Sequence, residues 1–277
     1  MRKYIFLFIM ALAALPLRAQ TYEELIDKAS KYEAKDSLAA AIKVYKQIIA
    51  KDPNNAHNSM AYANMGRAQR DMGNTKEALF SYGKALDISP HSVTILMERA
   101  TLYSDLNDYD HAIIDCNTIM DIDKFDRDAL NLRGYLYFKL KRYDEAKADY
   151  EDILLSDPKD VGARIGLATL DEAQEKYHDA MEIVNELIIE RPNDPEMYYM
   201  RANLDKDLIL YDYALMDIDK AIQVAVKPTV DMWVFRGDVQ LHLKKKLDAR
   251  QSYERAIKAG ASRAALLDRI KKCHQGF

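Results

Sequence analysis

The stretch that decides the fold, residues 130–158, is LNLRGYLYFKLKRYDEAKADYEDILLSDP. Its small and apolar residues follow the i, i+4, i+7 spacing of one helix face in two successive segments: Leu130, Gly134 and Tyr137, then Ala146, Tyr150 and Ile153. Pro158 ends the second segment, because proline has no N–H and disfavours helical geometry in the residue before it. Each segment is too short to be stable as an isolated helix. The stretch therefore predicts two amphipathic helices that need neighbours.

Repetition of the same pattern provides those neighbours. The small residue of the first helix recurs at steps of 34 or 35 residues, with a first copy 37 residues earlier: Ala29, Gly66, Ala100, Gly134, Ala168, Ala202 and Gly237. The aromatic position of the second helix is occupied by Tyr45, Tyr82, Cys116, Tyr150, Val184, Ile218 and Tyr253. Packed helix axes lie roughly 8–10 Å apart, and a small residue at the crossing permits that approach.

A helix–turn–helix unit with these small, aromatic and proline positions at this period resembles the tetratricopeptide repeat (TPR) family. The resemblance covers about 250 of the 277 residues in seven copies. It implies an all-α, right-handed α-solenoid over residues 20–261, with repeats starting near 22, 59, 93, 127, 161, 195 and 230. Residues 262–277 are predicted to form a C-terminal capping helix, over 262–274, and a short tail.

Residues 1–19 are predicted to be a signal peptide. Arg2 and Lys3 precede an apolar run over residues 4–17, and Ala19 is the expected last residue before cleavage. The run is shorter than the roughly 20 apolar residues that span a bilayer, although an uncleaved membrane anchor remains the alternative. The prediction is export, to the periplasm, to another part of the cell envelope or to the outside.

The charge argues against nucleic acid or an anionic membrane surface as the main partner. The full chain has a net charge of −4, from 40 basic and 44 acidic residues. Removing residues 1–19 takes away three basic residues and no acid, which leaves −7. Proteins that bind polyanions usually carry a basic excess.

No motif for catalysis, a metal or a cofactor stands out. The six histidines lack metal-ligand spacing, and there is no phosphate loop or nucleophile motif. An acidic run, Asp121, Asp123, Asp126 and Asp128, lacks the central Gly and final Glu of a calcium loop. We interpret it as helix capping and solvated loop. Cys116 and Cys273 are four repeats apart, too far for a disulfide bond. The sequence predicts a protein that is not an enzyme.

A charged pair also repeats. Arginine precedes the small residue in several first helices, and an aspartate follows sixteen residues later: Arg99 and Asp115, Arg133 and Asp149, Arg201 and Asp217. Repeat five instead has Leu167 and Ile183, so both positions become apolar together. Direct contact between the two positions is the favoured explanation. The alternative is that the arginines bind an anionic ligand.

The concave face of a TPR solenoid is lined mainly by first helices, and this is where a partner is expected to bind. The predicted groove consists of Asn64, Arg67, Asp128, Tyr135, Phe138, Glu196, Tyr199, Met200, Asn203, Asp231 and Phe235. Some proteins of the family bind a peptide carboxylate with lysine, asparagine and arginine. Here Asn64 matches, but Ile26, Ser30, Thr94 and Glu98 occupy the other positions, so that clamp is absent.

Aromatic residues with acids beside them favour a peptide that is apolar with basic flanks. Packing of these side chains against neighbouring first helices is the competing interpretation. The predicted function is a non-catalytic scaffold that binds a protein segment in the groove, in the cell envelope. The alternative is a structural subunit of an envelope assembly, or a homo-oligomer that uses the convex face or the array ends.

Overall fold

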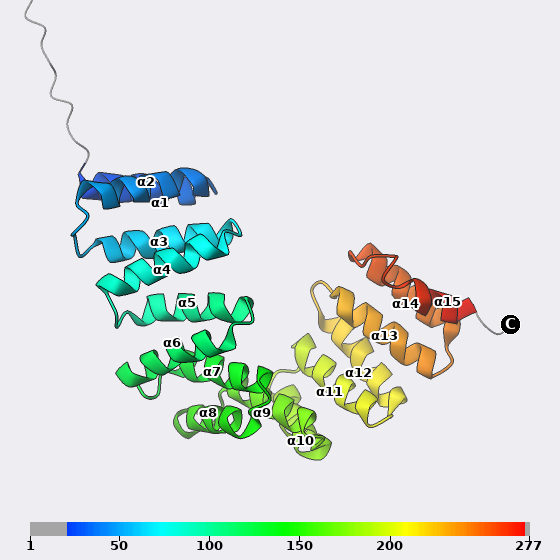
Figure 1. Ribbon diagram of the computed structural model, residues 1–277. Coiled ribbons are helices and arrows are strands. Elements are labelled where there is room, and N and C mark those ends of the chain that lie inside the picture. Colours follow the sequence, from blue (N-terminus) through cyan, green and yellow to red (C-terminus); the bar gives the residue numbers. More distant parts are fainter. Residues whose placement is uncertain (1–20, 275–277) are drawn as a thin grey trace, which may run out of the picture. The chain divides into compact units, whose positions relative to one another are not determined.

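A computed structural model describes residues 21–274 (Figure 1). The described residues form fifteen helices and no strand, which confirms the all-α prediction. The helices are α1 (Tyr22–Glu33), α2 (Leu38–Lys51), α3 (Asn58–Asp71), α4 (Thr75–Ile88), α5 (Val93–Asp105), α6 (Tyr109–Ile122), α7 (Arg127–Lys139), α8 (Tyr143–Ser156), α9 (Val161–Ala173), α10 (Tyr177–Glu190), α11 (Pro195–Asp207), α12 (Tyr211–Val224), α13 (Val230–His242), α14 (Lys246–Lys258) and α15 (Leu267–His274). The predicted signal peptide lies outside the described residues.

The chain divides into two compact units after Asp105. The described part of the first unit contains α1 to α5, and that of the second contains α6 to α15. Within each unit, the first helix of a repeat packs against the second helix that follows it, as in α3 with α4 and α11 with α12. The boundary falls in the turn of the third repeat.

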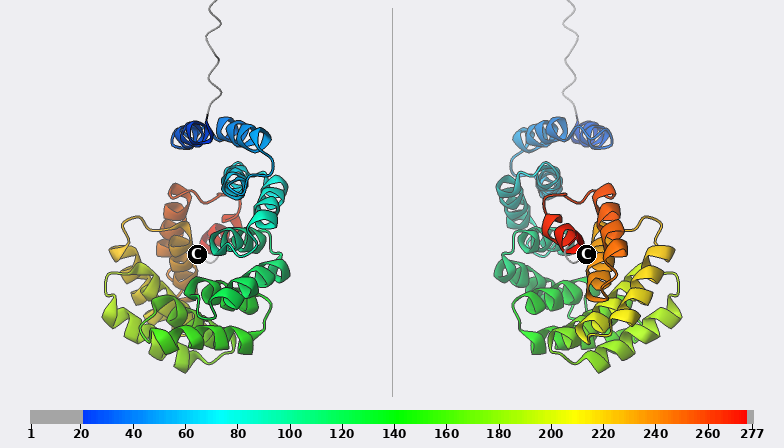
Figure 2. Two further views of the ribbon diagram at one scale, coloured as in Figure 1. Left: turned by 90° about the vertical axis from the view of Figure 1, so that its left-hand side faces the viewer. Right: turned by 90° about the vertical axis from the view of Figure 1, so that its right-hand side faces the viewer.

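The last helix is shorter than the 262–274 segment expected from the sequence. Residues 263–266 form turns, in which Ala265 N–H donates to Ser262 and Leu266 N–H donates to Arg263, and the helix begins at Leu267. Helix α15, drawn in red in Figure 2, contacts both α13 and α14. Leu266 and Cys273 pack with Tyr253 of α14 in one buried cluster.

From the second repeat onward, close approach of the two helices of a repeat depends on glycine wherever the aromatic position is tyrosine. A Cβ atom on Gly134 would lie 2.9 Å from the Tyr150 ring, and one on Gly237 would lie 2.5 Å from the Tyr253 ring. Such distances are shorter than van der Waals contact, so alanine would force the ring or the helix to move. From the second repeat onward, alanine stands at this position only where the aromatic position holds the smaller Cys116, Val184 or Ile218.

The turns between the helices of each repeat share one backbone conformation. A residue with a positive φ, between 55° and 78°, follows each of the seven first helices, three places after the end of α1 and two places after the end of the other six. These residues are Asp36, Gly73, Asn107, Lys141, Glu175, Ile209 and Lys244. Only one is glycine, although this left-handed region disfavours side chains with a Cβ. The geometry of the helix pair therefore determines the turn conformation.

Two of the predicted arginine–aspartate pairs lie in the second unit and form bidentate ion pairs. Arg133 donates from Nε and Nη2 to the Asp149 carboxylate at 2.9 and 2.6 Å, and Arg201 contacts Asp217 at 2.6 and 2.8 Å. The side chain of Asp149 is only 3 % exposed and that of Arg133 is 18 % exposed. The prediction of direct contact is confirmed for these two repeats.

Each arginine also forms a hydrogen bond to the second helix of the preceding repeat. This contact was not predicted, because the sequence pattern compares positions within one repeat. Arg133 Nη1 donates to Asn117 Oδ1 at 2.6 Å, and Arg201 Nη1 donates to Asn185 Oδ1 at 2.7 Å. Arg236 likewise joins Asp219 on α12 to Ser252 on α14, at 2.5 and 2.9 Å. The arginines therefore link successive second helices through the first helix that lies between them.

Repeats with serine at the aspartate position use a different polar partner within the repeat. The hydroxyl of Ser81 lies 2.6 Å from the side-chain amide of Gln69, and that of Ser252 lies 2.8 Å from that of Gln240. All four side chains are buried. A buried polar group needs a hydrogen-bond partner, so the serine and glutamine positions change together along the chain.

The Arg133–Asp149 pair can be tested by a double-mutant cycle. Asp149→Ala should lower the free energy of unfolding by about 1–3 kcal/mol, because it leaves a largely buried guanidinium without its carboxylate. Arg133→Leu combined with Asp149→Ile copies repeat five and should recover much of this loss. Urea denaturation of the wild type, both single variants and the double variant measures the coupling. Additive losses would contradict the contact.

Asp205 on α11 predicts a pH dependence. Burial, together with the nearby carboxylate of Asp217, raises the pKa of Asp205 to about 6 against the opposing effect of Arg201. The folded state therefore binds this proton more tightly than the unfolded chain, in which the pKa of aspartate is about 3.9. The group stabilises the fold fully below about pH 4, and this contribution is lost as the pH rises to about 6.

Asp205→Asn should therefore gain stability relative to the wild type as the pH rises from 4 to 7, by up to about 2–3 kcal/mol. Denaturation curves at several pH values measure the difference between the two proteins. Asp212→Asn, which changes an exposed aspartate on α12, serves as the matched control. Parallel curves for the wild type and Asp205→Asn would show that the carboxyl is not perturbed.

Candidate functional site

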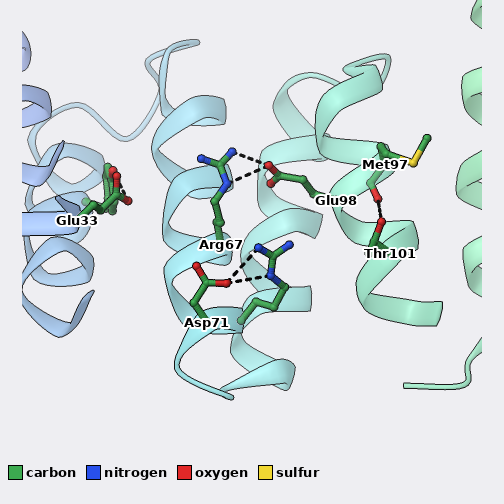
Figure 3. Close-up of polar contacts among 8 residues, drawn as sticks. Glu33, Arg67, Asp71, Met97, Glu98 and Thr101 are labelled. Carbon is green, nitrogen blue, oxygen red and sulfur yellow. Dashed lines mark hydrogen bonds and ion pairs between the residues drawn. The ribbon is translucent and has the colours of Figure 1, made fainter. Parts of the chain in front are cut away.

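In the first unit, charged residues on the first helices contact one another (Figure 3). Arg67 on α3 donates from Nε and Nη2 to Glu98 Oε1 on α5, at 3.0 and 2.5 Å. Glu33 on α1 accepts a hydrogen bond from the Tyr45 hydroxyl at 2.9 Å. Asn64, the other predicted groove residue of this unit, is half-buried. The predicted groove residue Arg67 is thus already paired with a carboxylate of its own unit.

In the second unit, the predicted aromatic residues differ in how much surface they offer. Tyr135 on α7 is 43 % exposed, whereas Phe235 on α13 is only 7 % exposed and belongs to the core. Tyr199 on α11 is half-buried and contacts the Phe235 ring edge-on, with 5.4 Å between ring centroids. Tyr135 and Tyr199 are therefore the rings that can touch a partner, and the buried Phe235 ring packs against Tyr199.

Three further predicted residues of the second unit pack mainly against the protein itself. Phe138 is half-buried beside Tyr143, with ring centroids 6.1 Å apart. Met200 packs against the buried cluster that contains Ala168. The side-chain amide of Asn203 donates to the carbonyl of Tyr199 at 2.9 Å and so holds the α11 surface in place.

The predicted acidic residues are exposed at the starts of their helices. Asp128, Glu196 and Asp231 lie in the first turns of α7, α11 and α13. In the part of the chain that the structure describes, no ion pair holds any of these three carboxylates. Burial, together with the charges of Asp231 and Asp238, raises the pKa of the Tyr199 hydroxyl against the opposing effect of Asn203. The carboxylates of Asp231 and Asp238 thus act on the Tyr199 hydroxyl.

A hollow of about 560 Å³ lies between α11, α13 and α15. Its charged lining consists of Lys206, Asp238, His242, Asp268, Arg269 and Lys272. Asp238 accepts hydrogen bonds from the Tyr253 hydroxyl and from Arg269 Nε, both at 2.8 Å. Lys206 Nζ lies 5.5 Å from the centre of the Phe235 ring. The hollow therefore brings Lys206, Arg269 and Lys272 to the C-terminal ends of α11 and α13, the two helices whose first turns carry Glu196 and Asp231.

Arg269 and Lys272 were not predicted from the sequence to line a hollow, because the last helix was expected only to cap the final repeat. The one available signal was the i, i+3 spacing of the two residues, which places them on one face of the helix. Nothing in the sequence alone shows that this face meets the end of α13. That contact depends on the turn at residues 263–266.

The described residues contain no group of three or more His, Cys, Asp or Glu that could hold a metal ion. Asp126 of the acidic run accepts from the Ala129 N–H and caps α7, as predicted. Burial raises the pKa of the Cys116 thiol to about 12, so it is not an activated nucleophile. Within residues 21–274, no helix has the length and apolar character required to cross a membrane.

Comparison with known proteins agrees with the repeat architecture. Models of the tetratricopeptide repeat match residues 61–92, 93–126 and 137–204. The crystal structure of a tetratricopeptide repeat protein from Parabacteroides merdae is 33 % identical, with a TM-score of 0.81, and the match covers 93 % of this chain and 100 % of that one. The yeast Tom70 structure is 17 % identical, with a TM-score of 0.60 over 93 % of this chain and 64 % of that chain, and shows the fold alone.

Among curated proteins, Hsp70-Hsp90 organizing protein 2 of Arabidopsis thaliana is 30 % identical over 103 residues, or 37 % of this chain. This chain spans only 18 % of that relative's length. The match to the Parabacteroides merdae structure covers all of that chain, and helix pairs of the same kind pack within both units. The chain belongs to the tetratricopeptide repeat family.

Proposed function

We propose that this protein is a non-catalytic scaffold that holds a segment of a partner protein against the first helices of residues 106–274. The observation that carries the proposal is the set of exposed, unpaired carboxylates beside partly exposed tyrosines. Glu196 precedes Tyr199 by three residues on α11, and Asp128 precedes Tyr135 by two turns on α7. Aromatic side chains supply contact area with few rotatable bonds.

The charges define the class of segment that fits. Acids at the starts of α7, α11 and α13 favour lysine or arginine on the partner, and the tyrosines favour an apolar core. The hollow with Lys206, Arg269 and Lys272 lies at the other ends of α11 and α13. A segment with an apolar core and basic flanks would complement the tyrosines and the acidic first turns of this face.

Binding can be tested with labelled peptides of four leucines flanked by lysines or, as the matched control, by glutamates. The lysine-flanked peptide should bind at least about tenfold more tightly in fluorescence anisotropy, because its charges oppose the exposed acids. Tyr135→Ala and Tyr199→Ala should each weaken binding by at least about 1 kcal/mol with little change in melting temperature. Equal binding of the two peptides would contradict the proposed specificity.

Phe235→Ala provides the comparison that separates core from surface. Because the ring is buried, its removal should lower the free energy of unfolding by about 3–5 kcal/mol. The wild-type protein and the three alanine variants are compared by circular dichroism melts in parallel with the binding assay. A stability loss of that size for Tyr135→Ala or Tyr199→Ala, with binding per folded molecule intact, would place these tyrosines in the core and remove the proposed surface.

The site of action in this proposal is the cell envelope. It is supported by the charged start, apolar run and Ala19 of residues 1–19. The mature chain should begin at Gln20, and the protein should fractionate with soluble envelope or external material. Intact-mass measurement after fractionation of the cells tests this. A cytosolic protein that retains Met1 would contradict it, without affecting the proposed binding face.

A further inference from the structure

The arginines that join successive second helices are replaced in two repeats. Arg99, Arg133, Arg201 and Arg236 occupy this position in repeats three, four, six and seven. Met65 takes the position in repeat two, and Leu167 takes it in repeat five. Neither side chain can make the charged, bidentate contact that Arg133 makes between α6 and α8. Two gaps between second helices therefore lack this bridge.

A hollow of about 390 Å³ lies at the first gap, between α2, α3 and α4. Met65 and Gln69 form its floor, and Lys46, Lys76, Glu77 and Phe80 surround it. Lys46 stands where Asn117 and Asn185 accept the arginines of other repeats, so an arginine here would meet a like charge. The Phe80 ring is 64 % exposed, with Lys84 Nζ at 5.8 Å from its centre. We name this surface the basic hollow.

The charge of this surface is opposite to that of the chain as a whole. Helix α2 carries three lysines and no acidic residue, in a protein with a net charge of −4. In the second unit, α8 carries five acidic residues and one lysine, and α10 carries four acidic residues and no lysine or arginine. Helix α2 of the first unit is therefore basic, whereas α8 and α10 of the second unit are acidic.

A second hollow, of about 440 Å³, lies on α8, the second helix that precedes the Leu167 repeat. It is lined by Ala148, Glu151, Asp152, Leu154 and Leu155, and we name it the acidic hollow. The side chain of Leu155 is 80 % exposed, although leucine is usually buried. Glu151 makes only an exposed ion pair with Lys147, at 3.6 Å, which leaves its charge available to a partner.

We propose that the two hollows bind each other between copies of this protein, so that Phe80 and its flanking lysines in one copy dock against Leu155 and its flanking acids in the next. The basic hollow needs an aliphatic group with carboxylates beside it, and α8 of a second copy supplies that chemistry. Since the two surfaces are different, a single contact between two copies leaves one hollow of each kind available to further copies. Such a heterologous contact forms rings or open chains.

Self-association on this face goes beyond the proposed peptide binding and does not depend on it. The contact uses second helices and leaves Tyr135 and Tyr199 on the first helices free. An assembly of copies would then present several binding faces to one partner, which raises the apparent affinity without any new contact within a face. Failure of self-association would leave the peptide-binding assay unaffected, and the reverse also holds.

The test is sedimentation velocity of the full mature chain at concentrations up to roughly 100 µM, where weak contacts populate oligomers. The wild type should associate, and association should weaken as salt is raised, because the charges are exposed. Lys46→Glu with Lys76→Glu, and separately Glu151→Lys with Asp152→Lys, should each weaken association at least about tenfold. Phe80→Ala should weaken it by a similar factor without changing the melting temperature.

Charge exchange makes the test specific. A variant with all four changes should associate again, because its two hollows have exchanged charge and still attract each other. An equimolar mixture of the two double variants should form mixed oligomers, because the hollows of one variant are then opposite in charge to those of the other. Lys227→Glu with Lys258→Glu, at exposed positions of the second unit, is the control with the same change in net charge and should behave as the wild type. A wild-type protein that stays monomeric, a control that loses association equally, or a fourfold variant that does not recover would each overturn the proposal.

Discussion

The structure depends on the close crossing of two helices within each repeat. Gly134 lies against the Tyr150 ring, and Gly237 lies against the Tyr253 ring, at distances that leave no room for a Cβ atom. The tyrosines are almost completely buried, so each crossing removes a large aromatic surface from water. Without this approach the short helices would lose most of their packing, and helices of this length are not stable alone.

Polar groups then specify how one repeat follows another. Arg133 and Arg201 each contact three helices, and their aspartate partners are buried. A buried carboxylate without its guanidinium would be strongly destabilising, so the pairs tolerate little displacement between neighbouring repeats. Where the arginine is replaced by Met65, this constraint is absent and a hollow opens between the second helices. The same position thus controls both the stacking of repeats and the shape of the outer surface.

The two faces of the repeats differ in chemistry. In the second unit the first helices combine partly exposed tyrosines with acids at their starts and basic groups around the α13–α15 hollow. Among the second helices, α2 is basic, and α8 and α10 are acidic. Neither face gathers the titratable groups of a catalytic centre within the described residues. A fold built of repeated helix pairs leaves these surface side chains free to vary, because the buried core positions and the arginine bridges maintain the stacking.

The sequence by itself determined the fold class and the repeat family, because a 34-residue period of small and aromatic residues in about seven copies has few physical solutions. It also identified the Arg133–Asp149 contact, since both positions change polarity together. It could not show that Asn117 completes that contact, because this residue lies in the preceding repeat and its partner is set by stacking. The sequence also left open whether Tyr199 and Phe235 are surface or core. Only the tertiary structure decided that Phe235 is buried and that Tyr135 is exposed, because helical spacing defines a face but not how deeply the next helix covers it.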